Sequence, residues 1–338
     1  MDNYNKIAIS SRIRFARNFS DINFISKLSD KKEISFLQDS TKALFENMHE
    51  FTYYPLKDMS IARCSALLER HIISKELIDN RDISAVVTNE EENIVIMIAE
   101  EDHLREQSIS TGFDLLGAYK RLLPIDKEII SHFKIAYDDD FGFLTSSPAN
   151  LGTAMRASVM IFIPALERSG KIKVLIKEAK QYGLTFRGIY GEGTQTIGSL
   201  YQISNQNSLG LNEEEIIDKV SDFFFDICRQ EESLRNALYE NNYIELRDEV
   251  QRAFGILTNC YSISEKEMIN LLSTLKLGEI FDFVKIKDEK LFQKLYYHGG
   301  GATLKEIMKF SDEKEENTIR AEYISKRVKN LVSLGGIK

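Results

Sequence analysis

The sequence predicts an α+β fold in which a sheet flanked by helices is followed by a smaller, all-helical part. Segments with period-two alternation of apolar and polar residues, typical of half-buried strands, recur along the chain before Gly210. Segments with helical periodicity lie between them, and after Gly210 nearly every segment has that periodicity. A chain of 338 residues is long enough for about two domains. We therefore predict one domain at residues 1–235 and a helical domain at residues 236–338.

The first strand is expected at residues 7–15, where apolar residues alternate with small or charged ones. This period places Arg12 and Arg14 together on the face opposite the apolar side chains. Asn212 is a good N-cap for a helix beginning at Glu213, and the glycines at 299–301 are expected to form a loop. The same periodicities predict the other elements in this order: helices at 30–48 and 60–79, paired strands at 83–87 and 94–99, a helix at 108–133 interrupted near Pro124, strands at 141–146 and 155–163, a helix at 171–182, and strands at 184–189 and 200–203.

Composition excludes several classes of protein. With 44 Lys and Arg against 52 Asp and Glu, the net charge is −8, whereas a general nucleic-acid binder needs a basic surface. We find no apolar stretch long enough to cross a bilayer and no secretory signal at the start. The three cysteines lie far apart without a CxxC motif. These features predict a reduced, cytoplasmic protein without a membrane partner.

Five arginines lie at strand and loop positions inside otherwise apolar segments, where an unpaired guanidinium would be costly. The chain has neither a GxxxxGK[ST] loop nor the HRD and DFG motifs, so the common ways of holding ATP are absent. Planar guanidinium groups pair well with phosphate oxygens. Local carboxylates are the competing partners, favoured roughly three to one for any single arginine. The five are Arg12, Arg14, Arg105, Arg156 and Arg187.

Around these arginines, the chain resembles in order the signature motifs of the phosphagen (guanidino) kinase superfamily. SSRIRFARN at 10–18 resembles the first motif, and EEDHLR at 100–105 resembles the second. SPANLGT at 147–153, followed by RAS at 156–158, resembles a CPxNxGT and RAS pair. RGIYGE at 187–192 resembles RGxxGE, and YQISN at 201–205 completes the series. Because the order is kept, the series is far more specific than any one motif.

Within this superfamily, the segments RGIYGEG, LYQISNQ and FGILTNC resemble the bacterial protein arginine kinases. The first motif begins at Ser10, so we expect no small N-terminal helical domain of the kind found in metabolite kinases. The resemblance implies a catalytic domain built on an antiparallel sheet flanked by helices. It also implies transfer of the γ-phosphoryl group of ATP, with Mg²⁺, to arginine side chains of proteins.

The resemblance assigns roles to individual residues. Glu101 and Glu192 would clamp the substrate guanidinium, and one of them would be the general base, because a group with a pKa of about 12.5–13.8 has no free lone pair at neutral pH. The five arginines would hold the ATP phosphates, and Mg²⁺ would be bound by those phosphates and water rather than by a protein metal site. His103 would orient its neighbours. The implied nucleotide-binding residues are Ser10, Ser11, Arg12, Ile13, Arg14, His71, Arg105, Arg156, Ala157, Ser158, Val159, Met160, Arg187, Gly188, Ile189, Tyr190 and Gly191.

Two positions depart from the pattern of the superfamily. Ser147 stands where the pattern has a cysteine whose thiolate helps to polarise the guanidinium, and a neutral hydroxyl cannot supply that charge. We therefore expect a working but weakened catalytic site that includes Ser147. Protein arginine kinases also carry a C-terminal RDxxRA motif that recognises phosphoarginine, of which only Arg320 and Ala321 remain here. Because Glu316 would repel a phosphate, the sequence gives little support to allosteric phosphoarginine binding.

The resemblance also implies partners. Substrates would be repressors of heat-shock genes and misfolded proteins marked for a Clp ATPase and its protease, and a zinc-containing activator protein and a homodimer are further expectations. Two alternatives stay open. One is a kinase for free arginine or another guanidino metabolite, against which the missing N-terminal helical domain counts. The other is a weakly active, ATP-binding regulatory scaffold, suggested by Ser147 and Glu316.

Overall fold

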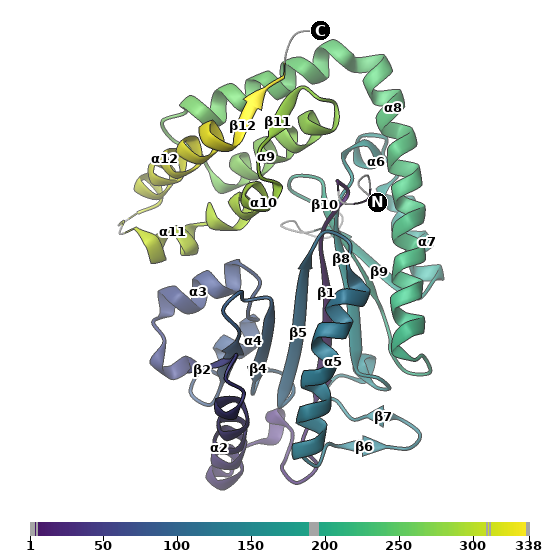
Figure 1. The fold of residues 1–338 in the computed structure, drawn as a ribbon, viewed down its shortest axis with the longest axis vertical. Coiled ribbons are helices and arrows are strands. Elements are labelled where there is room, and N and C mark those ends of the chain that lie inside the picture. Colours follow the sequence, from purple (N-terminus) through teal and green to yellow (C-terminus); the bar gives the residue numbers. More distant parts are fainter. Residues whose placement is uncertain (1–3, 5, 189–195, 309, 311, 336–338) are drawn as a thin grey trace.

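The computed structural model describes residues 4, 6–188, 196–308, 310 and 312–335. Its centre is an eight-stranded sheet with the strand order β2-β3-β4-β5-β1-β8-β10-β9, in which neighbouring strands are antiparallel (Figure 1). The predicted α+β class is confirmed. The strands are β1 (Ala8–Arg17), β2 (Thr52–Pro55), β3 (Ala85–Thr88), β4 (Ile94–Ile98), β5 (Leu104–Thr111), β8 (Met155–Phe162), β9 (Leu184–Gly188) and β10 (Leu200–Asn205).

The two central strands β1 and β8 divide their side chains between the faces of the sheet as the alternation predicts. Ile13, Phe15, Ala157 and Val159 all lie in one apolar core. Ile9 does not follow them, because the register between β1 and β8 shifts near the start of β1. It packs instead in a second core on the opposite face, so its predicted place with the other apolar residues of β1 is wrong.

Helices cover the two faces unequally. One face is covered by α2 (Lys31–Asn47), α5 (Leu115–His132), α7 (Ile172–Gln181) and the first half of α8 (Glu213–Asn259), which bury their apolar residues against it. The other face is covered at one end by α3 (Ile61–Glu69) and α4 (Lys75–Asp79), and at the other end by C-terminal helices. The middle of this second face carries charged and polar side chains. Short connections complete this part: η1 (Ile25–Lys27), η2 (Leu56–Asp58), η3 (Pro148–Asn150) and α6 (Pro164–Arg168).

Several predicted elements differ from the structure. The helix expected at 108–133 is wrong in its first part, because β5 occupies Leu104–Thr111 and only α5 is helical. Polar side chains fill most of the buried positions of β5, namely Glu106, Gln107, Ser108 and Ser110, so no alternation of apolar residues marks the strand. Pro124 does not interrupt α5. The helix expected at 60–79 is two helices, separated by a turn in which His71 has a left-handed φ of 57°. The strand expected at 141–146 is reduced to β7 (Gly142–Phe143), paired with β6 (Tyr137–Asp138).

The C-terminal part is helical, as expected, with a small two-stranded sheet that the pattern did not reveal. The side chain of Asn212 caps α8 in a capping box with Glu215, which confirms the predicted start. The backbone of α8 leaves helical geometry at Asn242 (φ −133°, ψ 31°), where two helices meet at a kink. The domain division predicted at 235–236 falls before this kink, inside the first of the two helices, and stays a prediction. No helix among the described residues is long and apolar enough to cross a membrane. The remaining elements are α9 (Glu265–Ile280), β11 (Val284–Ile286), α10 (Glu289–His298), α11 (Gly301–Ile307), α12 (Glu313–Leu331) and β12 (Val332–Leu334).

Candidate active site

The five predicted arginines lie on four strands of the sheet and share its helix-poor face. Arg14 of β1 stands directly opposite Arg156 of β8 and opposite Gln107 of β5. Arg105 lies two residues from Gln107 along β5, and Arg12 lies two residues from Arg14, so the period of two keeps all of them on one face. Arg187 of β9 pairs in register with Gln202 of β10, which in turn stands opposite Met160 on that face. The sheet therefore assembles into one surface arginines that are far apart in the sequence.

These guanidinium groups act on one another. Burial lowers the pKa of Arg14 well below its ordinary value, and the positive charges of the other four arginines lower it further. Burial and the charges of Arg187 and Arg105 likewise lower the pKa of Arg156. Like charges directly opposite in a sheet are destabilising, so such a cluster needs an anion. The Nε atoms of Arg14 and Arg156 are buried and have no hydrogen-bond partner in the part of the chain that the structure describes.

Local carboxylates explain only part of the cluster. Arg105 forms an ion pair with the buried carboxylate of Glu100, as the competing interpretation expects. Arg156 instead donates from Nη2 to Ser204 Oγ at 3.0 Å. The Nε and Nη2 atoms of Arg187 both donate to Gln202 Oε1, at 3.2 and 2.9 Å. Neutral partners leave the positive charge of these two arginines available to a ligand.

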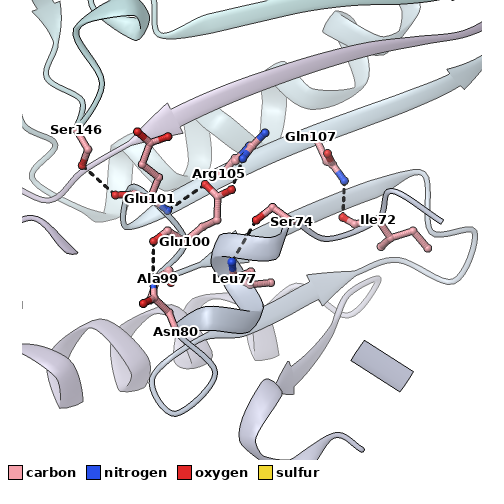
Figure 2. A network of polar contacts seen from close by, with 10 residues as sticks. All are labelled: Ile72, Ser74, Leu77, Asn80, Ala99, Glu100, Glu101, Arg105, Gln107 and Ser146. Carbon is pink, nitrogen blue, oxygen red and sulfur yellow. Dashed lines mark hydrogen bonds and ion pairs between the residues drawn. The ribbon is translucent and has the colours of Figure 1, made fainter. Parts of the chain in front are cut away.

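The acidic turn before β5 sorts its carboxylates into different environments (Figure 2). Glu100 is buried, pairs with Arg105 and accepts from the Glu101 backbone N–H at 3.0 Å. Glu101 is exposed, and its side chain extends away from this ion pair. Partial burial and the charges of Asp102 and Glu100 raise the pKa of Glu101, an effect that Arg105 opposes. A carboxylate with a raised pKa in contact with solvent is suited to accept a proton.

Asn18 and Asp102 fix this turn to neighbouring segments. Asn18 donates to Asp102 Oδ1 at 2.6 Å and accepts from the backbone N–H of His103 at 2.8 Å. The Nδ1 atom of His103 accepts from the backbone of Phe19 at 2.9 Å, while Nε2 contacts the backbone oxygen of Asn23 at 2.9 Å. Burial lowers the pKa of His103. These contacts agree with the orienting role expected for His103, and they show a positioning role for Asn18 that its place in the first motif could have suggested.

The predicted Ser147 lies beside the same turn. The preceding Ser146 donates its hydroxyl to the Glu101 backbone oxygen at 2.9 Å (Figure 2). Its backbone N–H donates to Asp102 Oδ1 at 2.7 Å. Ser147 is partly buried and starts the short helix η3 without capping it. Its hydroxyl has no hydrogen-bond partner within the described part of the chain, so the hydroxyl can turn toward a substrate.

The other predicted nucleotide residues divide between the two faces. Ser158 and Met160 share the face of the arginines, and the Ser158 hydroxyl is buried without a partner among the described residues. Ser11 points to the other face, where its hydroxyl donates to the Gly112 carbonyl at 2.9 Å. The side chains of Ile13, Ala157 and Val159 lie in the apolar core, so only their backbones could meet a nucleotide. Ser10 lies at the end of the site where β1 opposes Met160, and Gly188 ends β9. Four predicted residues, Ile189, Tyr190, Gly191 and Glu192, lie outside the described residues.

His71 stands at the edge of this face in the turn between α3 and α4. Its ring meets the ring of Tyr297 from α10 edge-on, with the centroids 5.9 Å apart. Burial and, to a smaller extent, the charge of Arg12 lower the pKa of His71 to about 4. His71 is therefore neutral at physiological pH and near the arginine cluster. A left-handed residue other than glycine is strained, and such strain is concentrated at functional sites.

The predicted allosteric residues lie in the interior of the C-terminal part. Arg320 is 1% exposed, and its donors are used by the Gly299 carbonyl at 2.7 Å, by the Ile263 carbonyl at 3.2 Å and by Asn317 and Glu316. Ala321 is buried as well. Glu316 thus stabilises Arg320 within the fold, and Arg320 is not presented to a phosphoarginine in this structure.

Within the part of the chain that the structure describes, no metal cluster lies at the site. Among the residues that the structure describes, no group of three or more His, Cys, Asp or Glu side chains is placed to hold a metal ion. A cavity of about 640 Å³ lies at the outer edge of the sheet, around β2 and the β3–β4 turn, and contains none of the five arginines. The candidate site is a positively charged face of the sheet, on which Arg187 is exposed and the other four arginines are partly buried, with the Glu101 carboxylate at its border.

Comparisons with known proteins assign this arrangement to a family. Residues 34–234 match the family described as ATP:guanido phosphotransferase, C-terminal catalytic domain, and residues 243–335 match the protein-arginine kinase McsB C-terminal domain. The chain is 38% identical to a protein-arginine kinase of Clostridium acetobutylicum, covering 96% of this chain and 97% of that one. It is 36% identical to a protein-arginine kinase of Bacillus subtilis, covering 86% and 80%.

Solved structures agree at the level of the fold. A duplicated taurocyamine kinase from Schistosoma mansoni superimposes with a TM-score of 0.63 and 26% identity, over 77% of this chain and 39% of that one. A lombricine kinase superimposes with a TM-score of 0.61 and 23% identity, over 69% and 68%. These neighbours share the architecture that presents the arginine-rich face.

Proposed function

Because the chain belongs to the ATP:guanido phosphotransferase family and, over 96% of its length, matches a protein-arginine kinase, we propose that it phosphorylates arginine side chains of proteins with ATP. A guanidinium nitrogen attacks the γ-phosphorus, the bond from that phosphorus to the β,γ-bridging oxygen breaks, and ADP leaves with the electron pair. The guanidinium gives up one proton to a general base. The products are ADP and a phosphoarginine side chain.

The observation that carries this proposal is the set of five arginines on one face of the sheet. A triphosphate would supply the negative charge that the opposed Arg14 and Arg156 need. Charge on the transferring phosphoryl group is stabilised chiefly by fixed positive groups and by positioning. Because the arginines come from paired strands, their spacing is held by the backbone ladder. We propose that the residues predicted from the motifs, including His71, Ser158 and Met160, bind the nucleotide here.

Among the residues that the structure describes, Glu101 is the candidate for the general base. It lies at the border of the positive face, and its pKa is raised by partial burial and by neighbouring carboxylates. Glu192 is proposed as the second carboxylate of the clamp, although it lies outside the described residues. Ser147 would accept a hydrogen bond from the substrate guanidinium. We propose that Mg²⁺ is bound by the ATP phosphates and water, because Mg²⁺ usually keeps several waters and binds through the phosphates of its substrate.

The choice of a protein as acceptor rests on relatives that are protein-arginine kinases and that match this chain over nearly all of their length. Under this proposal the substrates include a heat-shock repressor and misfolded proteins destined for a Clp ATPase. A zinc-containing activator, a homodimer and a cytoplasmic location belong to the same proposal. A kinase for free arginine is the second candidate, favoured only by the fold shared with taurocyamine and lombricine kinases.

The test is incubation of the chain with ATP, Mg²⁺ and an arginine-bearing protein such as casein, beside a reaction with free arginine. Mass spectrometry under conditions that spare the acid-labile P–N bond detects the product. We expect phosphoarginine on the protein and little on free arginine. Glu101→Gln should abolish it, and Glu90→Gln, which changes an exposed carboxylate in the β3–β4 turn, should not. Product on free arginine alone would favour the second candidate, and ATP binding without product would favour a regulatory scaffold.

A further inference from the structure

We propose that the C-terminal helical part completes the nucleotide site: it holds residues 69–71 between the start of α11 and Tyr297, and so fixes His71 where it meets ATP. This inference rests on the proposed nucleotide-binding role of His71, Arg12 and Met160. Docking of the C-terminal part and binding of ATP would then favour each other. Tyr297 and Glu69 are positioning residues in this scheme.

Tyr297 contacts residues of the nucleotide site that come from separate parts of the catalytic fold. Its ring lies edge-on to His71 in the turn after α3. Its hydroxyl is 3.8 Å from Sδ of Met160 on β8. Burial raises the pKa of Tyr297 to about 12, and the nearby charge of Arg12 on β1 opposes that shift. One side chain of α10 therefore stands where the proposed nucleotide residues of three segments converge.

Glu69, two residues before His71, is held by the adjoining segment of the C-terminal part. Its carboxylate accepts from the backbone N–H of Ala302 at 3.1 Å and from that of Thr303 at 2.7 Å, in the first turn of α11. This approach needs a glycine at position 300, because a Cβ there would lie 2.2 Å from Cδ of Glu69. The loop expected at 299–301 is wrong at Gly301, which begins α11, and within the remaining link Gly300 has the specific task of leaving room for Glu69.

The two contacts act on the same short turn. His71 has a left-handed φ of 57°, which the turn does not favour by itself. With Glu69 fixed on one side and the ring of Tyr297 on the other, the turn has little freedom to relax. If ATP binds to this conformation of His71, the contacts that hold the turn also increase the affinity for ATP. Bound ATP then stabilises these contacts by the same free energy, because such coupling is reciprocal.

The experiment measures ATP affinity in variants that break each contact. Glu69→Gln and Gly300→Ala disrupt one contact from its two sides, and Tyr297→Leu removes the other. We expect each to raise the Kd for ATP, by calorimetry, and the KM for ATP by about fivefold or more. The kcat at saturating ATP should stay within about twofold, because the arginines and Glu101 are unchanged. The double variant Glu69→Gln/Gly300→Ala should bind ATP no more weakly than the single variant with the higher Kd, since both substitutions act on one contact.

The matched control is Tyr296→Leu, the preceding residue of α10. Tyr296 is buried, and its hydroxyl is 3.2 Å from Ser273 Oγ of α9, whereas the contacts with His71 and Met160 are made by Tyr297. This change should lower the Tm without changing the Kd for ATP. If Glu69→Gln and Gly300→Ala leave the Kd unchanged or lower it, the inference is overturned. Failure of the proposed function is distinguishable, because it would leave ATP binding and its dependence on these contacts intact while no phosphoarginine forms.

Discussion

Replacing Arg17 by methionine should destabilise the catalytic part more than any change to the five site arginines. Arg17 follows Arg12 and Arg14 on β1 but is 1% exposed. Its Nε and Nη2 donate to the two carboxylate oxygens of Asp126 on α5, at 2.8 and 2.9 Å. Its guanidinium also lies 3.8 Å from the ring centroid of Phe143. Arg17 thus ties the strand that carries the site to the helix behind it.

The magnitude follows from what the substitution leaves behind. Without Arg17, the carboxylate of Asp126 is buried and unpaired, which costs about 3–5 kcal/mol. Arg17 Nη1 also donates to the carbonyls of Ala16 at 2.8 Å and Thr153 at 3.1 Å, and losing these bonds adds about 1 kcal/mol each. Replacing both partners removes the unpaired charge, so Arg17→Met/Asp126→Leu should recover most of the loss.

The assay is thermal and urea unfolding followed by far-UV circular dichroism, since the chain has no tryptophan. For a total loss of about 6 kcal/mol, the Tm should fall by roughly 12–24 °C. The double variant should lie within about 2 kcal/mol of the wild type. A Tm decrease under about 3 °C for Arg17→Met, or a double variant less stable than the single one, would refute the reasoning.

Three further predictions concern single side chains. Burial and the neighbouring Asp126 raise the pKa of Glu106 well above its ordinary value, so the stability that protonated Glu106 contributes is full below about pH 4.3 and is lost as pH rises through the folded pKa. Glu106→Gln should therefore raise the Tm at pH 8 and change it little at pH 4, and an equal change of Tm at both pH values would contradict this. Ser147→Cys should raise the rate of arginine phosphorylation, with a gain that grows from pH 7 to pH 9 as a thiol of pKa about 8.5 ionises; a pH-independent rate would exclude a thiolate effect. Asn212→Ala should cost about 1 kcal/mol in urea unfolding, whereas Asn212→Ser, which can still cap α8, should cost much less.

The sequence predicted the arginine-rich site better than it predicted some of the elements that carry it. Arg12, Arg14 and Arg156 lie on strands recognised from their alternation, so their shared face followed from the period of two. Arg105 lies on β5, which the pattern did not reveal, because Glu106, Ser108 and other polar residues fill its buried positions. Motif resemblance found Arg105 where periodicity could not. It did not distinguish Arg17 from the arginines of the site, because its partner Asp126 lies 109 residues away on α5.

What the sequence determined by itself was local: strand and helix periods, the Asn212 cap, and motifs whose order identified the chemistry. Only the tertiary structure decided which charges meet. A register of paired strands, not a spacing along the chain, brings Arg14 opposite Arg156 and puts Arg105 and Arg187 within range of their charge. Likewise, the packing of α10 and α11 against α3 sets Tyr297 beside His71 and Glu69 beside Gly300. Local propensity acts over a few residues, whereas these contacts depend on how distant segments bury their apolar faces, and that is settled only when the whole chain packs.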